Sequence, residues 1–224
     1  MPKCPRCVQP IHAGPEACPH CGFELSQLDE ILGSSEVRMK RVNDVAGLMR
    51  RRLRDKAEKH LLRFEKQFPQ LFFAVHFAAL SEMTSLRQYA FWLLNRASIA
   101  DLDEKRPNEN GILMVVDVNS KSATITYGYH LDAFLREEDL FQVLSRAHGY
   151  LAEGDYVRGI KVASKQLAAV LRKRAAKANR DPEAFAPAKS LAHQELPRLR
   201  QRRKDGSGMV TSEEEQVETE ESQG

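Results

Sequence analysis

Cysteine is absent from this chain beyond residue 21, because all four cysteines of the 224 residues lie in the first 21. No Cys-x5-Arg loop is therefore present to supply a thiolate nucleophile. Long apolar runs are missing as well: no stretch of about 18 apolar residues could cross a bilayer, and no apolar signal segment opens the chain. We therefore expect a cytoplasmic protein with reduced thiols.

Recognisable catalytic patterns are also missing. No glycine-rich loop that could cradle a phosphate occurs, and no Asp-x-Asp pair ends an apolar strand, since Asp101-Leu-Asp103 falls in a polar loop. We find no internal repeat. These absences remove the common nucleotide-binding and covalent hydrolase signatures, although metal-dependent hydrolysis by dispersed carboxylates is left open.

The four cysteines form two pairs, Cys4 with Cys7 and Cys18 with Cys21, each with two residues between them and ten residues between the pairs. This spacing predicts a zinc ribbon, in which two tight turns each give two thiolates to one tetrahedral Zn²⁺. Two alternatives compete with it: a pair of disulfides, which needs an oxidising compartment, and a redox Cys-x-x-Cys, which would follow a strand in a βαβ unit. No such strand precedes the first cysteine.

Residues around the cysteines fit tight turns. Gly22 follows the second pair, where a positive φ is needed, and Pro5 and Pro19 stiffen the two turns. Because all four ligand positions are cysteine, the metal keeps no open position for a substrate. We expect the zinc to stabilise the fold and to take no part in chemistry.

Charge is divided unevenly along the chain. Residues 205–224 hold seven acidic side chains and no basic one, so residues 1–204 carry all 34 basic residues and 24 of the 31 acidic ones. A basic body with an acidic tail suits anionic partners, but it is also what a solvated surface with a disordered end looks like. Proline residues and the basic cluster Arg198–Lys204 come before that acidic end.

Apolar residues recur at helical spacing between Val37 and Phe68, which predicts one amphipathic helix with a break near Gly47. The segment before it, from Leu25 to about Ser35, reads as a polar linker. The opposite face of the helix is basic and could contact phosphates or an anionic membrane surface, or be a solvated face; its residues are Arg38, Lys40, Arg41, Arg50, Arg51, Arg54, Lys56 and Lys59. No aromatic residues are interleaved for stacking on bases, which disfavours nucleic acid.

The middle of the chain alternates strand and helix signals. We predict strands at 71–77, 112–118 and 123–127, the last two as an antiparallel hairpin, and helices at 86–94, 137–151 and 156–178. Asp155 is the predicted N-cap of the last helix.

Three segments of the chain together resemble the TPM domain family. They are Asn110-Gly111-Ile112-Leu113-Met114-Val115-Val116, the following strand into Gly128-Tyr129-His130-Leu131-Asp132, and Gly154-Asp155-Tyr156-Val157-Arg158-Gly159-Ile160. His130 and Asp132 stand where the family motif has glycine and glutamate. The resemblance runs from about Phe64 to Arg174. It implies a compact α/β domain with a mixed sheet, and it brings with it the acid phosphatase activity ascribed to a plant thylakoid member and the accessory roles ascribed to others.

Carboxylates near the strand ends are the candidates for a second site. Asp117 ends a strand, Asp132 follows the hairpin, Glu137 opens a helix and Asp155 precedes the next one. Oxygen ligands of this kind could hold Ca²⁺ or Mg²⁺, whereas an acid at a helix start is also stabilised by the helix dipole alone. Glu138, Asp139 and His130 are the remaining candidates, the histidine as an acid or base.

The sequence thus predicts an α/β protein with four parts: a zinc ribbon (1–24), a linker and long amphipathic basic helix (25–63), a compact mixed-sheet TPM-like domain with flanking helices (64–178) and a largely disordered tail, basic and then acidic (179–224). We expect a cytoplasmic interaction or accessory module, of a scaffold or quality-control kind, that binds protein partners. A divalent-cation-dependent, acid phosphatase-like hydrolase and a nucleic-acid-associated protein that uses the ribbon and basic helix are the alternatives.

Overall fold

Two strands with no exposed residue occupy the centre of the molecule. The computed structural model describes residues 3–11, 16–99 and 108–185. Within them, β3 (Phe72–Ala78) and β5 (Gly111–Asp117) are buried over their whole length and pair in parallel. Runs of apolar residues without alternation are typical of strands that are covered on both faces. The predicted strands at 71–77 and 112–118 are confirmed.

The sheet is completed by one strand on each side of this pair. β2 (Val42–Asp44) pairs in parallel with β3, and β6 (Ser122–Tyr127) pairs antiparallel with β5, so the order is β2-β3-β5-β6. The turn between β5 and β6 contains Lys121 at φ 52°. The predicted hairpin is therefore confirmed, and β6 lies at an edge of the sheet.

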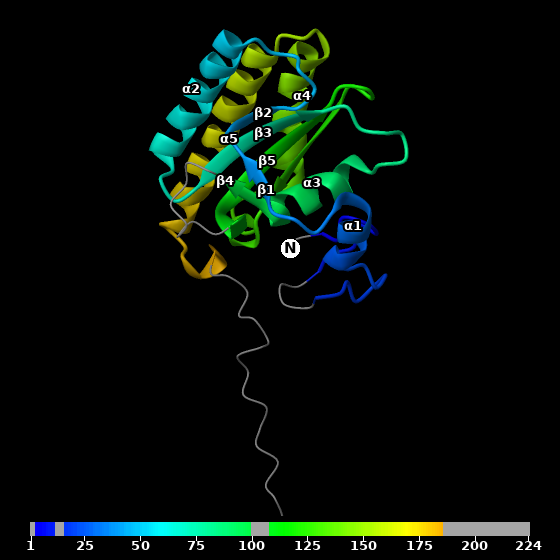
Figure 1. Ribbon diagram of the computed structural model, residues 1–224. Helices are drawn as coiled ribbons and strands as arrows, with labels where there is room; N and C mark the ends of the chain where they lie inside the picture. Colours follow the sequence, from blue (N-terminus) through cyan, green and yellow to red (C-terminus); the bar gives the residue numbers. More distant parts are fainter. Residues whose placement is uncertain (1–2, 12–15, 100–107, 186–224) are drawn as a thin grey trace, which may run out of the picture.

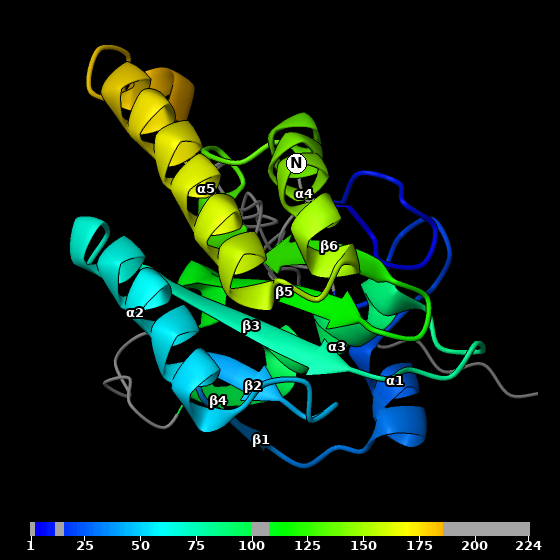
Figure 2. The same ribbon diagram turned by 90° about the horizontal axis from the view of Figure 1, so that it is seen from above.

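Three helices cover one face of the sheet: α2 (Arg51–Gln67), α4 (Glu137–Ala152) and α5 (Tyr156–Ala178) (Figure 2). Phe73, Val75 and Phe77 of β3 belong to the same buried cluster as these helices. The Phe73 ring packs edge-on against Phe64 of α2, at 5.5 Å between centroids. Aromatic contacts of this kind add to the burial of apolar area.

The other face is covered by α3 (Leu86–Arg96), by α1 (Leu25–Leu32) and by the N-terminal cysteine segment (Figure 1). A small parallel sheet of β1 (Val37–Met39) and β4 (Ala97–Ile99) adjoins them. Phe72 and Ala74 of β3 pack into this second cluster. Short 3₁₀ turns, η1 (Asn108–Asn110), η2 (Tyr129–Leu131) and η3 (Glu183–Phe185), complete the described chain.

The single helix predicted from Val37 to Phe68 is wrong in its first third. Two short strands, β1 and β2, precede α2, and the predicted linker contains helix α1. Both carboxylate oxygens of Asp44 accept bonds from the backbone N–H groups of Leu48 and Met49, which fixes a turn that a helix could not make. Gly47 has φ 70° within this turn, so the predicted break is real.

The remaining helices agree with the sequence. α3, α4 and α5 occur where they are predicted, and the Asp155 side chain accepts a bond from Arg158 N as the N-cap of α5. Of the tail predicted as largely disordered (179–224), residues 186–224 lie outside the described residues, and residues 179–185 include the 3₁₀ turn η3. No helix in the described part of the chain has the length and apolar character needed to cross a bilayer.

Arg41, predicted on an exposed basic face, is buried instead and forms an ion pair with Glu65 of α2. Its Nε and Nη2 donate to the two carboxylate oxygens at 2.8 and 3.1 Å. The pair links the turn before β2 to the helix after it. A bidentate contact of this kind fixes both side chains in one orientation.

We predict that Glu65→Ala destabilises the protein by about 3 kcal/mol, because it leaves the buried guanidinium without this carboxylate. Urea unfolding followed by far-UV circular dichroism measures the change. The double variant Arg41→Met/Glu65→Leu should recover most of the loss, since it removes both charges. A loss below about 1 kcal/mol in Glu65→Ala would show that the pair is not buried as described.

Candidate functional site

Each cysteine pair lies in its own tight turn, and the two turns have the same hydrogen bonds. Cys4 N donates to Gln9 O at 2.9 Å and Val8 N donates back to Cys4 O at 3.0 Å. In the second turn, Cys18 N donates to Phe23 O and Gly22 N donates to Cys18 O, both at 2.8 Å. The sequence Cys-Pro-x-Cys therefore adopts the same backbone conformation in both turns.

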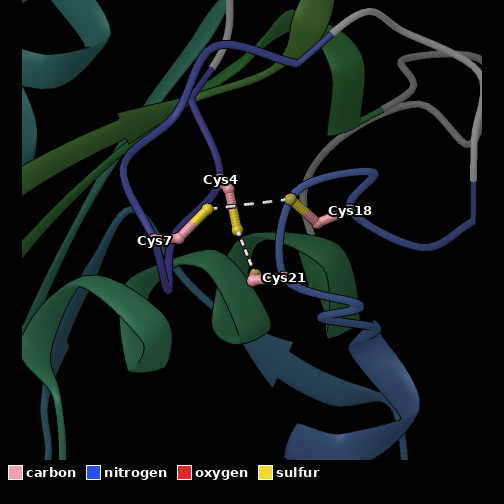
Figure 3. A group of neighbouring side chains, drawn as sticks. All are labelled: Cys4, Cys7, Cys18 and Cys21. Carbon is pink, nitrogen blue, oxygen red and sulfur yellow. Dashed lines mark hydrogen bonds between the residues drawn. The ribbon is translucent and has the colours of Figure 1, made fainter.

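The four sulfurs converge on one point (Figure 3). Cys4 Sγ lies 3.8 Å from Cys21 Sγ, Cys7 Sγ lies 3.8 Å from Cys18 Sγ, and all four lie within 4.8 Å of one another. A tetrahedral ion with metal–sulfur bonds of about 2.3 Å has sulfur–sulfur edges of about 3.8 Å. The cluster therefore has the size of a four-thiolate metal site, and the sulfurs are too far apart to be disulfides.

The backbone favours thiolate at this cluster. Arg6 N donates to Cys4 Sγ at 3.4 Å. Burial opposes ionisation of Cys18, but the backbone N–H groups of His20 and Cys21, together with the side chains of Cys4 and Cys21, outweigh it and lower the pKa of the Cys18 thiol to about 6. Burial and the neighbouring sulfurs raise the pKa of Cys21 to about 12. A bound cation would stabilise all four thiolates together, so this donor set fits a metal ion.

The cysteine segment packs closely on the rest of the protein. Phe23, directly after the second turn, meets Phe91 of α3 edge-on at 6.0 Å between ring centroids. Asp29 of α1 accepts bonds from Trp92 Nε1 at 3.2 Å and from Arg96 Nε at 2.9 Å, both on α3. Cys4 and Cys18 themselves belong to the buried cluster on the second face of the sheet. The cysteine cluster is thus part of a hydrophobic core.

A groove of about 940 Å³ lies beside the cysteine segment, along edge strand β6 and between α3 and α4. Lys3 and Pro5 of the first cysteine turn line one end of it. Apolar side chains line much of the rest: Phe91 and Leu94 of α3, Ile125 of β6, and Leu140, Phe141 and Leu144 of α4. Phe141 is 71% exposed, which is unusual for a large aromatic residue. The groove was not predicted from the sequence.

Backbone groups of β6 face this groove. Gly128 N donates to Gly111 O, and the β5–β6 register follows from that bonded pair. Because bonded and non-bonded pairs alternate in an antiparallel ladder, the N–H and C=O groups of Ala123, Ile125 and Tyr127 point away from β5. Among the described strands, β6 pairs with β5 alone. The edge therefore offers a row of donors and acceptors.

Two of the predicted carboxylates, Asp132 and Glu137, line the groove, and so does Glu138. Burial, followed by the charges of these three residues, raises the pKa of the Tyr127 hydroxyl to about 12. Lys3 forms an ion pair with Glu137, and this contact lowers the pKa of that carboxyl. The groove therefore combines carboxylates with the cations Lys3, Arg87 and Arg136, and both Lys3 and Arg87 pair with Glu137.

The other predicted carboxylates stabilise turns and helix ends. Asp117 accepts bonds from Leu80 N at 3.0 Å, from the backbone N–H groups of Asn119 and Ser120, and from the Ser120 hydroxyl. Burial alone would raise the pKa of Asp117, but these bonds lower it. Asp155 caps α5, and Asp139 pairs with Arg174 at 2.9 Å. In the described residues, the cysteines form the one group of three or more metal-ligating side chains, so the structure does not gather the carboxylates.

The two histidines of interest differ in surroundings. His130, predicted as a candidate acid or base, is exposed and its Nδ1 lies 3.0 Å from Asn110 Oδ1. His76 of β3, which sequence reasoning missed, is buried beside Tyr89, whose hydroxyl lies 3.1 Å from its Nε2. Burial lowers the pKa of His76 to about 4. A histidine inside an apolar run was the signal that could have drawn attention to it.

One difference between the two cysteine turns, Val8 in the first and Gly22 in the second, gives a test of their equivalence. Val8 has φ 64° where Gly22 has φ 66°, and a β-branched residue is strained there. We predict that Val8→Gly raises the stability of the protein by about 1 kcal/mol and that Gly22→Val lowers it by a similar amount or more. Thermal unfolding of both variants measures the changes. A lower Tm for Val8→Gly would contradict the assigned backbone.

No curated protein matches the chain. Three solved structures resemble it: the BA42 protein of the psychrophilic bacterium Bizionia argentinensis (14% identity, TM-score 0.48, 58% of this chain and 86% of that one), the N-terminal domain of cg2496 from Corynebacterium glutamicum (13%, 0.45, 61% and 82%) and the N-terminal domain of a P. gingivalis protein (18%, 0.45, 65% and 87%).

The sequence also matches the TPM domain over residues 42–170. This region begins at β2 and ends within α5, so it contains the whole four-stranded sheet and the helices α2 to α4. Because the match spans more than half of the chain, the protein belongs to the TPM domain family.

Proposed function

We propose that this protein is an accessory module that binds an extended segment of a partner protein in the groove along β6, and that its cysteine cluster holds one structural zinc ion. The observation that carries the proposal is the open edge of β6 inside an apolar groove. A peptide can add to such an edge as a further strand, with its main chain bonded to β6 and its alternate side chains in pockets.

The shape of the groove supports an extended peptide. Ala123, Ile125 and Tyr127 alternate along β6, so an added strand would find a bonding residue at every second position. Phe91 of α3 and Phe141 of α4 flank the strand on its two sides. Aromatic residues in this position are typical anchors of protein interfaces, because they bury a large area at a small cost in conformational entropy.

Zinc is the metal that the cysteine cluster suits best. Four thiolates in a tetrahedron of this size, with no further ligand position, are typical of structural zinc sites. The ion would hold the two turns together, and the first of these turns supplies Lys3 and Pro5 to the groove. Metal binding and the shape of the groove are therefore linked through the same short segment.

The absence of a gathered catalytic set favours binding over catalysis. Asp117, Asp139 and Asp155 bond to nearby backbone or to an arginine. In the groove, Glu137 is paired with Lys3 and with Arg87. A divalent-cation-dependent phosphatase would need several carboxylates on one ion. In the described part of the chain no such group of carboxylates forms.

Removal of the metal should destabilise the whole protein, because Cys4, Cys18 and Phe23 pack in the core on the second face of the sheet. We expect about one zinc per chain by elemental analysis. Dialysis against a chelator should then cost about 3 kcal/mol, which is a fall in Tm of roughly 6–12 °C for a chain of this size.

Added Zn²⁺ should restore the original Tm, and added Mg²⁺ should not. Cys7→Ser should behave as the chelated protein does. Ser26→Ala changes an exposed hydroxyl of α1 that lies outside the cluster, and it serves as the control. A protein that contains no metal and has an unchanged Tm would contradict the zinc assignment.

The groove is tested with peptides selected from a random library displayed on phage, with the full chain as bait. We expect peptides with alternating apolar residues, and we expect Phe141→Ser to weaken their binding about five-fold, as a loss of about 1 kcal/mol of apolar contact does. Met83→Ser is the matched control, because Met83 is 95% exposed and lies outside the groove.

Hydrogen exchange locates the bound peptide. The amides of Ala123, Ile125 and Tyr127 should become protected on binding, while those of α2 should not change. Binding that is insensitive to Phe141→Ser and leaves β6 unprotected would overturn the proposal. Hydrolysis of a phosphomonoester that requires Ca²⁺ or Mg²⁺ and is lost in both Asp132→Asn and Glu137→Gln would favour a catalytic function instead.

A further inference from the structure

Helices α2 and α5 lie side by side on the face of the sheet opposite to the cysteine segment (Figure 2). They run in the same direction. Lys56 of α2 and Val157 of α5 line one small cavity at their beginnings, and Arg172 Nη1 donates to Gln67 Oε1 at 3.2 Å near their ends. The two helices therefore form a long seam on the surface.

This seam is basic along its length. α5 contains no acidic residue at all. We call the following set the basic seam: Lys56 and Arg63 on α2, with Lys161, Lys165 and Arg172 on α5, all of them exposed. Spacings of four or seven residues keep the members on one stripe of each helix. Within the described residues, none of the five makes an ion pair with a carboxylate.

His60 lies between the two halves of the basic seam. It is one turn from Lys56 and Arg63 on α2, and it is half-buried. Burial and then the charges of Arg63, Lys161 and Lys165 lower the pKa of its imidazole. The cations of both helices therefore lie close enough to His60 to disfavour its protonated form. Repulsion among these cations destabilises the seam unless an anion binds there.

The chain itself contains an anion of suitable size. Residues 213–221 include six glutamates, Glu213, Glu214, Glu215, Glu218, Glu220 and Glu221, with no basic residue among them. We propose that this acidic segment, which lies beyond the described residues, binds to the basic seam of α2 and α5. The seam is then an internal docking surface that an external polyanion reaches only by displacing the segment.

The length of the connection permits this contact. The described chain ends at Phe185, whose ring packs 5.5 Å from that of Phe134. A random coil of the same length as residues 186–212, which is 27 residues, would span about 30 Å on average. Helix α5, with 23 residues, is about 34 Å long, so the acidic segment can reach the seam. Tethering also gives a local concentration in the millimolar range, which favours the segment over a free partner.

Nucleic acid is a weaker candidate for the same surface. The exposed residues of the basic seam include no aromatic side chain on which a base could stack. A contact that depends on charge alone suits a glutamate-rich segment, because it requires no fixed geometry. It should weaken with salt, because charges on the surface are screened beyond about 3 Å at 1 M ionic strength.

The titration of His60 in the full chain, followed by NMR, tests the proposal at the seam itself. Bound glutamates favour the protonated imidazole, so replacement of all six glutamates by glutamine should lower the His60 pKa by about 0.5 unit or more at low salt. The difference should disappear at about 1 M salt. His76, buried beside Tyr89 of α3 on the opposite face of the sheet, is the internal control, and its pKa should not change.

A second measurement separates the seam from other basic surfaces. Binding of a duplex oligonucleotide should become about ten-fold tighter in the glutamine variant, because the seam is uncovered. Adding Lys161→Gln and Lys165→Gln should abolish that gain. Adding Arg38→Gln and Lys40→Gln, which removes two exposed charges outside the seam, should leave most of it.

An unchanged His60 pKa would overturn the proposal, and so would duplex binding that is equal with and without the six glutamates. Either result would mean that the acidic segment lies elsewhere, for example on the basic residues at 198–204 of the same tail. A gain in duplex binding that survives Lys161→Gln and Lys165→Gln would overturn it as well, because the uncovered surface would not be the seam.

Discussion

Burial of β3 and β5 on both faces is the constraint from which the arrangement of this protein follows. Neither strand has a polar face that could meet water, so the chain must supply two separate layers. One layer is made by α2, α4 and α5, which bury Phe73 and Phe77. The other layer consists of α3 together with the N-terminal segment that contains the cysteines, because α3 does not cover this face of the sheet alone. The two cysteine turns therefore form part of a layer of the fold.

This arrangement explains why the groove lies where it does. The sheet ends at β6, and the layers above and below it continue past that edge as α4 and α3. The first cysteine turn closes one end, with Lys3 bound to Glu137. An edge strand between two helices is both protected from uncontrolled aggregation and open to one added strand, which is the combination that a peptide-binding site requires.

Local signals predicted most of the fold. The apolar runs of β3 and β5, the tight hairpin into β6, the Asp155 cap and the spacing of the cysteines each depend on residues close together in the chain, and all were found. β1, β2 and β4 were missed because a three-residue strand is defined by its partner, and its partner is distant in sequence. The spacing of Val42 and Met49 fits a helix as well as it fits the observed strand and turn. The hydrogen bonds that Asp44 accepts stabilise the turn in place of a helix. The groove joins α3, β6, α4 and the cysteine segment, so no local pattern could reveal it.

The packing of the N-terminal segment has a practical consequence for anyone who shortens this protein. The region that matches the TPM domain begins at residue 42, after both cysteine turns, α1 and β1. A fragment cut at that boundary would keep the hydrogen-bonded sheet but bare the outer side of α3, including the rings of Phe91 and Trp92. Exposed apolar surface of this kind drives self-association. A fragment that begins at the boundary of the TPM domain match would thus be prone to self-association. Shortened forms of the protein should therefore keep the first forty residues.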